Sequence, residues 1–324
     1  MKKLLILGGT YFIGRKLVEV ALEHNEYEVY ILNRGSRKTF EDGRVNHIIA
    51  DRENPVQMKT ALKEYEFDYI IDISCLNKSH VDILFDSVNT AKLRKAVFLS
   101  SSSVYRDTES GIVKDETAAL GENAFWGAYG TDKIEAEKQY KFYTEKYGIE
   151  CSIVRPPYVY GEYNYARRES FVFDHILSGK PIIVPSKNNL IQFIYVGDLA
   201  KTFLALLKAD ANSVEIYNVG NNVAVTMLEW VILCGYVVKK NPQIYLYTGN
   251  EFNGKEYFPF HDYDNVLNCS KIKKIMKDET DFIQGLDAAY HWYEENKKQI
   301  VFNPKTAETE QYILSKENDR IRIQ

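Results

Sequence analysis

Short apolar runs alternate with amphipathic stretches along the first half of the chain. Residues 29–32, 69–73 and 96–99 are runs of apolar, partly β-branched residues of the length of a buried strand. Residues 12–22 and 56–65 instead place their apolar side chains at helical spacing. Strands that are apolar on both faces and alternate with helices are typical of βαβ units. The pattern therefore predicts an α/β fold with a parallel sheet.

The pattern changes in the second half of the chain. It predicts a long helix over residues 129–147, ended by Gly148, and a further strand over residues 151–154. Beyond them the elements are shorter and mixed, with strands at 193–196 and 216–219 on either side of a helix. The sequence thus predicts a doubly wound parallel sheet with a smaller, mixed C-terminal domain.

Composition limits the class of protein. The 324 residues are 45% hydrophobic and 27% charged, which is typical of a globular protein of about two domains. The formal net charge of −4 argues against sequence-independent binding of nucleic acid, although it does not exclude a local basic patch. Residues 4–7 are too short for a signal peptide, and no apolar run is long enough for a membrane helix. The four cysteines lack metal-ligand spacing, so we expect reduced thiols in a cytoplasmic protein and no metal site.

A glycine-rich turn, Gly8-Gly9-Thr10-Tyr11-Phe12-Ile13-Gly14, follows the first predicted strand and opens a helix. Glycines let the backbone approach a pyrophosphate, and the free N–H groups of the helix attract its charge. The turn therefore predicts a dinucleotide site, with a tight structural turn as the alternative. The residues expected to contact this cofactor are Gly8, Thr10, Tyr11, Phe12, Ile13 and Gly14.

The second predicted strand ends without the acidic residue that commonly holds the ribose of NAD. The chain has Asn33 and Arg34 there, followed by Arg37 and Lys38. Arg34 can pair with a 2′-phosphate, assisted by Arg37 or Lys38. This favours NADP over NAD, while a solvated basic loop is the alternative.

Two polar clusters lie where a parallel sheet builds its site. Tyr129 and Lys133 stand four residues apart at a helix start, which puts both on one face of the helix. A nearby ammonium lowers the pKa of a phenol, so Tyr129 can act as a general acid or base. Residues 99–105 hold four serines at the end of the fifth predicted strand. Taken singly, the clusters could also be a surface pair and a polar turn.

In this order, the motifs resemble those of extended short-chain dehydrogenases/reductases, the NAD-dependent epimerase/dehydratase family. The resemblance implies a Rossmann-like fold, in which Ser101 orients the substrate, Tyr129 moves a proton and Lys133 holds the cofactor ribose. It also implies that Asp51 contacts adenine. Tyr11 stands where the family usually has a glycine, so its ring would crowd the diphosphate. In this the chain resembles a branch that includes chloroplast stem-loop-binding proteins.

Later segments extend the resemblance. Residues 154–161 resemble the family's RPxxVYG segment, which implies that Arg155 and Pro156 lie near nicotinamide and substrate. A buried hydrogen-bonding role is the alternative for Arg155. Ser102 and Ser103 stand where sugar-nucleotide dehydratases carry acids, which disfavours dehydration. Ser102 is expected to contact the substrate. Asp198 is expected to cap a helix.

Arg167 and Arg168 open the predicted substrate segment, where they could bind a diphosphate or form a solvated surface pair. The predicted division of the chain is a dinucleotide-binding domain at 1–161, rejoined by 191–219, a substrate domain at 162–190 and 220–303, and a polar tail at 304–324.

The first hypothesis is an NAD(P)-dependent oxidoreductase or epimerase that acts on a sugar nucleotide or related alcohol. As in many members of the family, it would form a homodimer through the helix that carries Tyr129. A non-catalytic or RNA-associated protein is the second hypothesis, and a nucleotide-sensing regulator is the third. The combination of Ser101, Tyr129 and Lys133 favours the enzyme, and the net charge opposes RNA binding.

Overall fold

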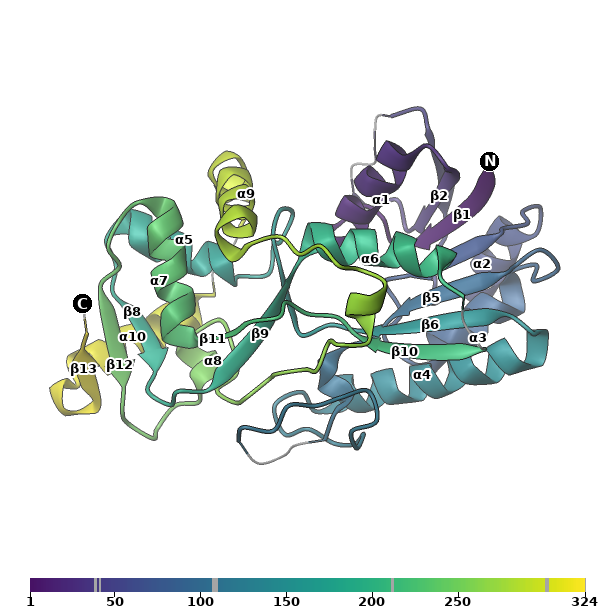
Figure 1. The fold of residues 1–324 in the computed structure, drawn as a ribbon. Helices are drawn as coiled ribbons and strands as arrows, with labels where there is room; N and C mark the ends of the chain where they lie inside the picture. The colour runs from purple at the N-terminus through teal and green to yellow at the C-terminus, as the bar shows by residue number, and fades with distance from the viewer. Residues whose placement is uncertain (38–39, 41, 107–109, 211–212, 301–302, 324) are drawn as a thin grey trace.

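The computed structural model describes residues 1–323 apart from 38–39, 41, 107–109, 211–212 and 301–302. These described residues form a seven-stranded sheet of order β10-β6-β5-β4-β1-β2-β3, parallel throughout (Figure 1). Its strands are β1 (Lys2–Leu7), β2 (Tyr27–Asn33), β3 (Val45–Ile49), β4 (Tyr69–Asp72), β5 (Lys95–Leu99), β6 (Glu150–Arg155) and β10 (Val214–Asn218). The order reverses between β1 and β4, and such sheets bind ligands at the carboxyl edge beside that point. The prediction of a Rossmann-like parallel sheet is confirmed.

Helices cover both faces of this sheet, which explains why its strands are apolar on both sides. One face carries α1 (Phe12–His24) and α6 (Val196–Lys208). The other carries α2 (Pro55–Leu62), α3 (Lys78–Ser87) and α4 (Ala128–Tyr147), and the short turn η1 (Ser102–Val104) follows β5. Within the described residues, no helix combines the length and apolarity that crossing a membrane requires.

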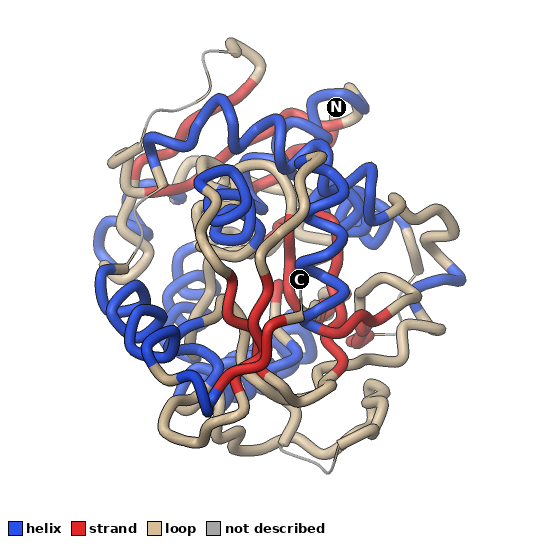
Figure 2. Tube along the Cα trace, turned by 90° about the vertical axis from the view of Figure 1, so that its left-hand side faces the viewer, coloured by secondary structure: helices blue, strands red, loops and turns tan. Residues whose placement is uncertain are grey.

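The rest of the chain builds a smaller domain beside the sheet. In Figure 2 this smaller domain faces the viewer. Its described strands form two three-stranded sheets, β11-β9-β7 and β13-β12-β8. The strands are β7 (Tyr158–Tyr160), β8 (Ile182–Pro185), β9 (Leu190–Tyr195), β11 (Ala224–Thr226), β12 (Ile244–Tyr247) and β13 (Arg320–Arg322). The helices are α5 (Glu169–Ser178), α7 (Met227–Val238), α8 (Gly254–Tyr257), α9 (Phe282–Asn296) and α10 (Pro304–Ser315), with short turns η2 (Ile272–Lys274), η3 (Lys297–Gln299) and η4 (Glu317–Asp319). The core is aromatic: Trp230 stacks on Phe193 with 3.9 Å between ring centres.

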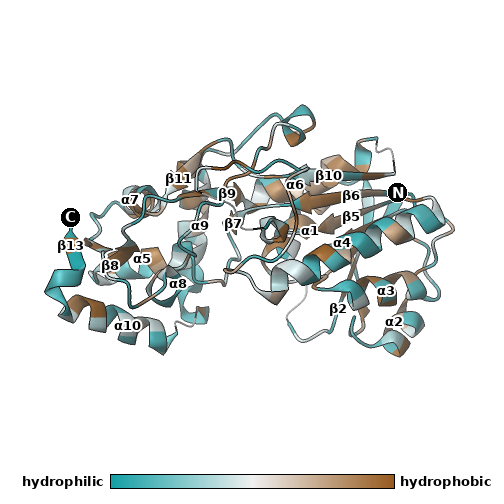
Figure 3. Ribbon diagram, turned by 90° about the horizontal axis from the view of Figure 1, so that it is seen from below, coloured by the Kyte–Doolittle hydropathy of each residue, from teal (hydrophilic) through white to brown (hydrophobic). Residues whose placement is uncertain are grey.

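The C-terminal segment, for which the sequence predicts a polar tail or a loose helix from residue 304, is folded. α10 buries Ile313 completely, and β13 pairs antiparallel with β12. Hydrophilic positions dominate α10 (Figure 3), and Glu310 and Ile313 are the residues of the helix that become buried. With so few buried residues, α10 leaves no clear apolar pattern in the sequence.

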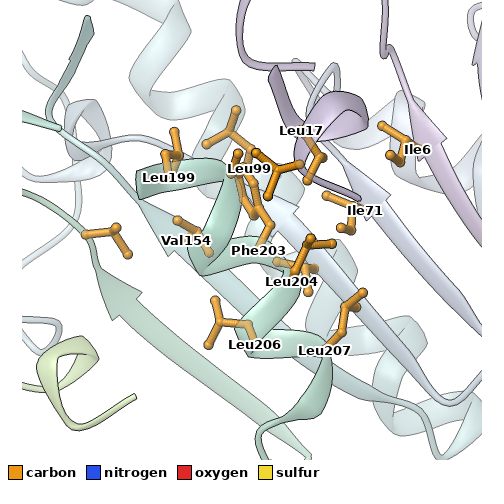
Figure 4. Packing of buried hydrophobic residues seen from close by; sticks show 14 of the residues in the cluster. Ile6, Leu17, Ile71, Leu99, Val154, Leu199, Phe203, Leu204, Leu206 and Leu207 are labelled. Atoms are coloured by element: carbon orange, nitrogen blue, oxygen red, sulfur yellow. The ribbon is translucent and has the colours of Figure 1, made fainter. Parts of the chain in front are cut away.

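The chain rejoins the seven-stranded sheet later than residue 191, because β9 pairs with β7 and β11. The return begins with α6, whose Phe203 and Leu204 join a buried cluster with Leu99 of the sheet (Figure 4).

Asp198 does not cap α6: it lies in the first turn, and its carboxylate accepts hydrogen bonds at 2.7 Å from both the N–H and the hydroxyl of Thr280. The capping prediction is therefore wrong, and Asp198 fastens a distant loop instead.

The four cysteines are buried and free. Burial raises the pKa of Cys75, Cys151 and Cys269 to about 12. These thiols therefore stay neutral and serve as packing residues.

One face of α4 is polar and yet buried against the sheet. The ammonium of Lys133 donates to the carbonyl oxygen of Leu99 at 2.8 Å, at the end of β5. The hydroxyl of Tyr140 donates to Asp72, at the end of β4, at 2.8 Å. Glu137 lies between them on the same face and is buried. Polar bonds to the strand ends thus hold α4 in place along its length.

Glu137 forms a buried ion pair with Arg155 at the end of β6. The guanidinium Nε and Nη2 lie 2.8 and 2.6 Å from the two carboxylate oxygens. Ser100 donates to the same carboxylate at 2.6 Å, and Arg155 donates to the hydroxyl of Tyr105 at 3.1 Å. Arg155 is only 1% exposed. This arrangement favours the structural alternative for Arg155 over its expected contact with substrate.

Replacing Glu137 with alanine should leave the Arg155 guanidinium buried without its carboxylate. Because an uncompensated buried charge is costly, we expect the free energy of unfolding to fall by about 3–5 kcal/mol. Urea denaturation followed by circular dichroism measures this loss. The control is Glu135→Ala, which breaks an exposed pair with Lys138 on the same helix and should cost less than about 1 kcal/mol. Equal losses in the two variants would contradict the assignment.

Candidate functional site

The glycine-rich turn lies at the carboxyl edge of the sheet, between β1 and α1. All the residues predicted for it, Gly8 to Gly14, line a pocket of about 200 Å³ together with Ile73 and Ser74, which follow β4. A Cβ at Gly14 would lie 2.6 Å from the backbone nitrogen of Gly9, so the tight turn needs glycine there. The turn thus leaves an opening beside the point where strand order reverses.

The residues expected to recognise the cofactor ribose lie at the end of β2. The side-chain amide of Asn33 donates to the Gly8 carbonyl oxygen at 3.2 Å, which ties β2 to the turn. Arg34 is exposed beside it. Asp51 follows β3, where its carboxylate accepts from the N–H of Glu53 at 3.1 Å, as a turn residue does. Lys38 lies outside the described residues.

Tyr11 joins an aromatic stack instead of projecting freely. Its ring stacks on that of Tyr165 with centres 4.9 Å apart, and the edge of Tyr165 meets Trp292 of α9 at 5.1 Å. The guanidinium of Arg37 lies over the ring of Tyr11, 4.2 Å from its centre. Arg37 is therefore engaged on this ring in the structure, apart from its predicted role at a 2′-phosphate. The residue that replaces the family's glycine links the two domains.

Polar contacts beside this stack hold the small domain against α1. Lys16 donates to the carboxylate of Glu162 at 2.8 Å, and Tyr163 donates to Glu19 at 2.7 Å. The segment after β7 therefore crosses the amino-terminal half of α1, next to the glycine-rich turn.

Ser101 and Tyr129 come together at the carboxyl end of β5. A Cβ at Gly130 would lie 2.4 Å from the carbonyl oxygen of Ser103, so glycine allows α4 to start directly against η1. Although 39% of Tyr129 is exposed, its phenol oxygen lies among protein atoms, and this burial raises its pKa. A hydrogen bond with Ser101 and the charge of Arg168 act in the opposite direction.

Lys133 lies on the same face of α4 but turns into the protein. Its Nζ donates to the carbonyl oxygens of Cys75, at 2.5 Å, and Leu99, and it lies 5.9 Å from the centre of the Tyr129 ring. Burial lowers the pKa of Lys133 to about 8. The expectation that this ammonium lowers the pKa of Tyr129 therefore differs from the structure, in which the pKa of the phenol is raised.

The residues predicted to lie near the substrate do not all gather at one place in the structure. Arg168 acts on Tyr129 by its charge, whereas Arg167 lines a different cavity in the small domain. Ser102 is 5% exposed, and its N–H donates to the carbonyl oxygen of Pro156 at 2.9 Å. Ser102 and Pro156 thus help to build the floor beneath Ser101.

Aromatic and basic residues from other segments complete the surroundings of Tyr129. The Trp126 ring lies 6.0 Å from that of Tyr129 and 4.9 Å from that of His261. Burial, assisted by the charge of Lys255, lowers the pKa of His261 to about 4, so this imidazole is neutral near pH 7. A cavity of about 630 Å³ continues from His261 and Lys255 to Lys187. The sequence analysis missed Trp126, Lys187 and Lys255, because no motif marks them.

A family model and several known proteins are similar to this chain in sequence. The model of the NAD dependent epimerase/dehydratase family matches residues 4–220. The 41 kDa chloroplast stem-loop binding protein b of Arabidopsis thaliana is 28% identical over 309 residues, which cover 90% of this chain and 79% of that protein. A putative UDP-glucose 4-epimerase of Methanocaldococcus jannaschii is 25% identical over 319 residues, which cover 91% of this chain and 99% of that protein.

Solved structures share the fold. The dTDP-glucose 4,6-dehydratase of Bacillus anthracis, in complex with NAD, has a TM-score of 0.77 at 21% identity, with 93% of this chain and 99% of that one covered. The UDP-glucose 4-epimerase of Thermotoga maritima, with UDP-glucose, has a TM-score of 0.77 at 16% identity, with 91% and 99% covered. At these identities the likeness supports the fold, and the match over residues 4–220 supports membership. The chain belongs to the NAD dependent epimerase/dehydratase family.

Proposed function

We propose that the protein is an NAD(P)-dependent epimerase or oxidoreductase that acts on a sugar nucleotide or a related alcohol. The observation that carries this proposal is the proximity of the Ser101 hydroxyl to the Tyr129 phenol at the carboxyl edge of the sheet, where the glycine-rich turn also lies. A family member of known structure contains NAD, and another contains UDP-glucose. The four free, buried thiols support a cytoplasmic location for this activity.

The glycine-rich turn fits a dinucleotide. Its residues leave an open pocket. Tyr11 is the N-cap residue of α1, but its side chain makes no hydrogen bond to the helix. Backbone N–H groups at the start of α1 therefore stay free for a pyrophosphate. A cofactor bound there would provide hydride transfer through its nicotinamide. We infer a preference for NADP, because Arg34 is exposed where NAD-binding folds commonly carry an acid.

The chain's own residues would handle the proton and the orientation of the substrate. Tyr129 is positioned to give a proton to, or take one from, the reacting oxygen, while Ser101 holds that oxygen by a hydrogen bond. The charge of Arg168 favours the phenolate that forms when the proton leaves. Lys133, held by two backbone carbonyls, would contact the cofactor ribose.

The cavity beyond His261 suits the remainder of a sugar nucleotide. It measures about 630 Å³, and Lys187 and Lys255 line it. Of these, Lys187 can bind a diphosphate by charge-assisted hydrogen bonds. Ser102 and Ser103 are buried where dehydratases carry acids, which favours epimerisation or reduction over elimination.

Titration of the purified protein with NADPH and NADH tests the cofactor site. We expect NADPH to bind more tightly, and Arg34→Ala to weaken NADPH by about tenfold while leaving NADH unchanged, because one charge-assisted hydrogen bond is lost. Calorimetry measures both constants. Arg94→Ala is the control, since Arg94 precedes β5 at the opposite end of the sheet and is exposed.

Equal binding of both cofactors, unaffected by Arg34→Ala, would contradict the preference for NADP. Binding of neither, without recovery in Tyr11→Gly, would contradict the cofactor site. The second function would then gain support if a labelled RNA stem-loop shifts in a gel at low salt, because a stem-loop binding protein is 28% identical to this chain.

Tyr129→Phe removes the proton donor and keeps the ring. We expect turnover of a responsive sugar nucleotide to fall by at least about 100-fold, with cofactor affinity retained. Nicotinamide absorbance and sugar NMR follow the reaction. Tyr147→Phe is the control on the same helix, since this exposed tyrosine lies at its far end. A variant that binds cofactor and keeps the natural rate would instead favour the nucleotide-sensing regulator.

We also infer a homodimer that associates through α4. Phe142 is 53% exposed on the outer side of this helix, and such an apolar ring gains by burial at an interface. Light scattering should give the mass of two chains for the natural protein and of one chain for Phe142→Lys. A monomer at every concentration of the natural protein would refute the dimer.

A further inference from the structure

A second cavity lies within the small domain, between α5, residues 255–259 and α10. Its volume is about 520 Å³, which is the size of pockets that enclose drug-sized molecules. Apolar side chains form much of the wall, including Phe171 of α5, Phe258 and Leu314 of α10. A molecule in it would therefore bury an apolar body between two helices.

The charged residues of this cavity are unequally paired. Asp174 lies 3.4 Å from the ammonium of Lys180, and Glu310 lies 3.0 Å from the imidazole of His175. The carboxylate of Asp174 thus already has a cationic partner, and that of Glu310 faces the imidazole of His175.

Two cations of the lining stay without a carboxylate. Among the described residues, no acidic group lies within ion-pair distance of Arg167 or Lys255, and Lys255 donates to the backbone carbonyl of Pro259. Burial and the neighbouring charge of Arg168 lower the pKa of Lys255 to about 8. The cavity is therefore suited to an anion.

This cavity is separate from the reaction site. Arg167 and Arg168 are neighbours in sequence, yet Arg168 acts on Tyr129 while Arg167 lines the cavity. One wall is α10, which lies beyond residue 220, where the match to the family ends. The two cavities meet at Lys255, which lines both. Arg167 belongs to the second cavity alone.

We propose that the cavity between α5 and α10 binds a small molecule that has an apolar body and one anionic head, distinct from the substrate at Tyr129. Arg167 and Lys255 bind the head by charge-assisted hydrogen bonds. Phe171, Phe258 and Leu314 enclose the body. The head is a carboxylate, sulfonate or phosphate, since each presents acceptor oxygens to these two donors.

Two fluorescent probes test the proposal. One is 8-anilinonaphthalene-1-sulfonate, and the other is N-phenyl-1-naphthylamine, which has the same rings without the sulfonate. We expect each to bind the natural protein at one saturable site. Arg167→Ala should weaken the sulfonate by about tenfold and leave the neutral probe unchanged, because it removes a bond to the head alone. Calorimetry gives stoichiometry and affinity.

A cavity-filling pair of variants locates the probes. Ala307 of α10 lines the cavity, whereas its exposed neighbour Glu308 is not part of the lining. Ala307→Trp should abolish binding of both probes, and Glu308→Trp should not, with melting curves verifying that each variant folds. If Ala307→Trp does not fold, the contrast between the two probes in Arg167→Ala decides the question.

Three results would overturn the proposal: no saturable binding to the natural protein, equal binding to Ala307→Trp and the natural protein, or equal effects of Arg167→Ala on both probes. NADPH affinity, measured in the same variants, is expected to stay unchanged. Loss of probe binding with NADPH affinity retained therefore tests this cavity, while failure of NADPH to bind any variant concerns the proposed function alone.

Discussion

The buried polar face of α4 is the constraint on which the site depends. Lys133, Glu137 and Tyr140 reach the ends of β5, β6 and β4, so the helix cannot slide or turn without breaking several buried bonds. Such bonds are costly to lose, because each partner would stay buried and unsatisfied. They fix the helix start, and Gly130 lets that start touch η1. The meeting of the Tyr129 phenol with Ser101 is a consequence of this fixed register.

The second constraint is the junction between the domains, in which Tyr11 has replaced a glycine. Here the Tyr11 ring stacks on Tyr165 and lies under the guanidinium of Arg37. Tyr165 continues to Trp292 of α9, and Glu162 binds Lys16 of α1. The turn that would hold the cofactor thus also carries the packing of the small domain.

The sequence predicts the sheet well because each strand is buried on both faces and each connection is a helix, which leaves a continuous local signal. The site is less readable, since its parts come from distant segments. Tyr129 and Ser101 have motifs, whereas His261, with Lys255 acting on it, reaches the Trp126 ring beside Tyr129 only through the folding of the small domain. Arg155 illustrates the limit in the opposite direction: its motif is visible, but burial decides its role.

The net charge of the chain likewise does not show where the charged side chains gather in the fold. A chain of formal charge −4 still places Lys187 and Lys255 around one cavity, and Arg167 and Lys255 around a second. These cations lie in hollows lined by aromatic rings instead of along an open stripe, and a polyanion binds by neutralising many phosphates along such a stripe. A compact anion with an attached organic body fits a hollow of this kind better. The distribution of charge therefore agrees with small-molecule chemistry more closely than with recognition of a nucleic acid backbone.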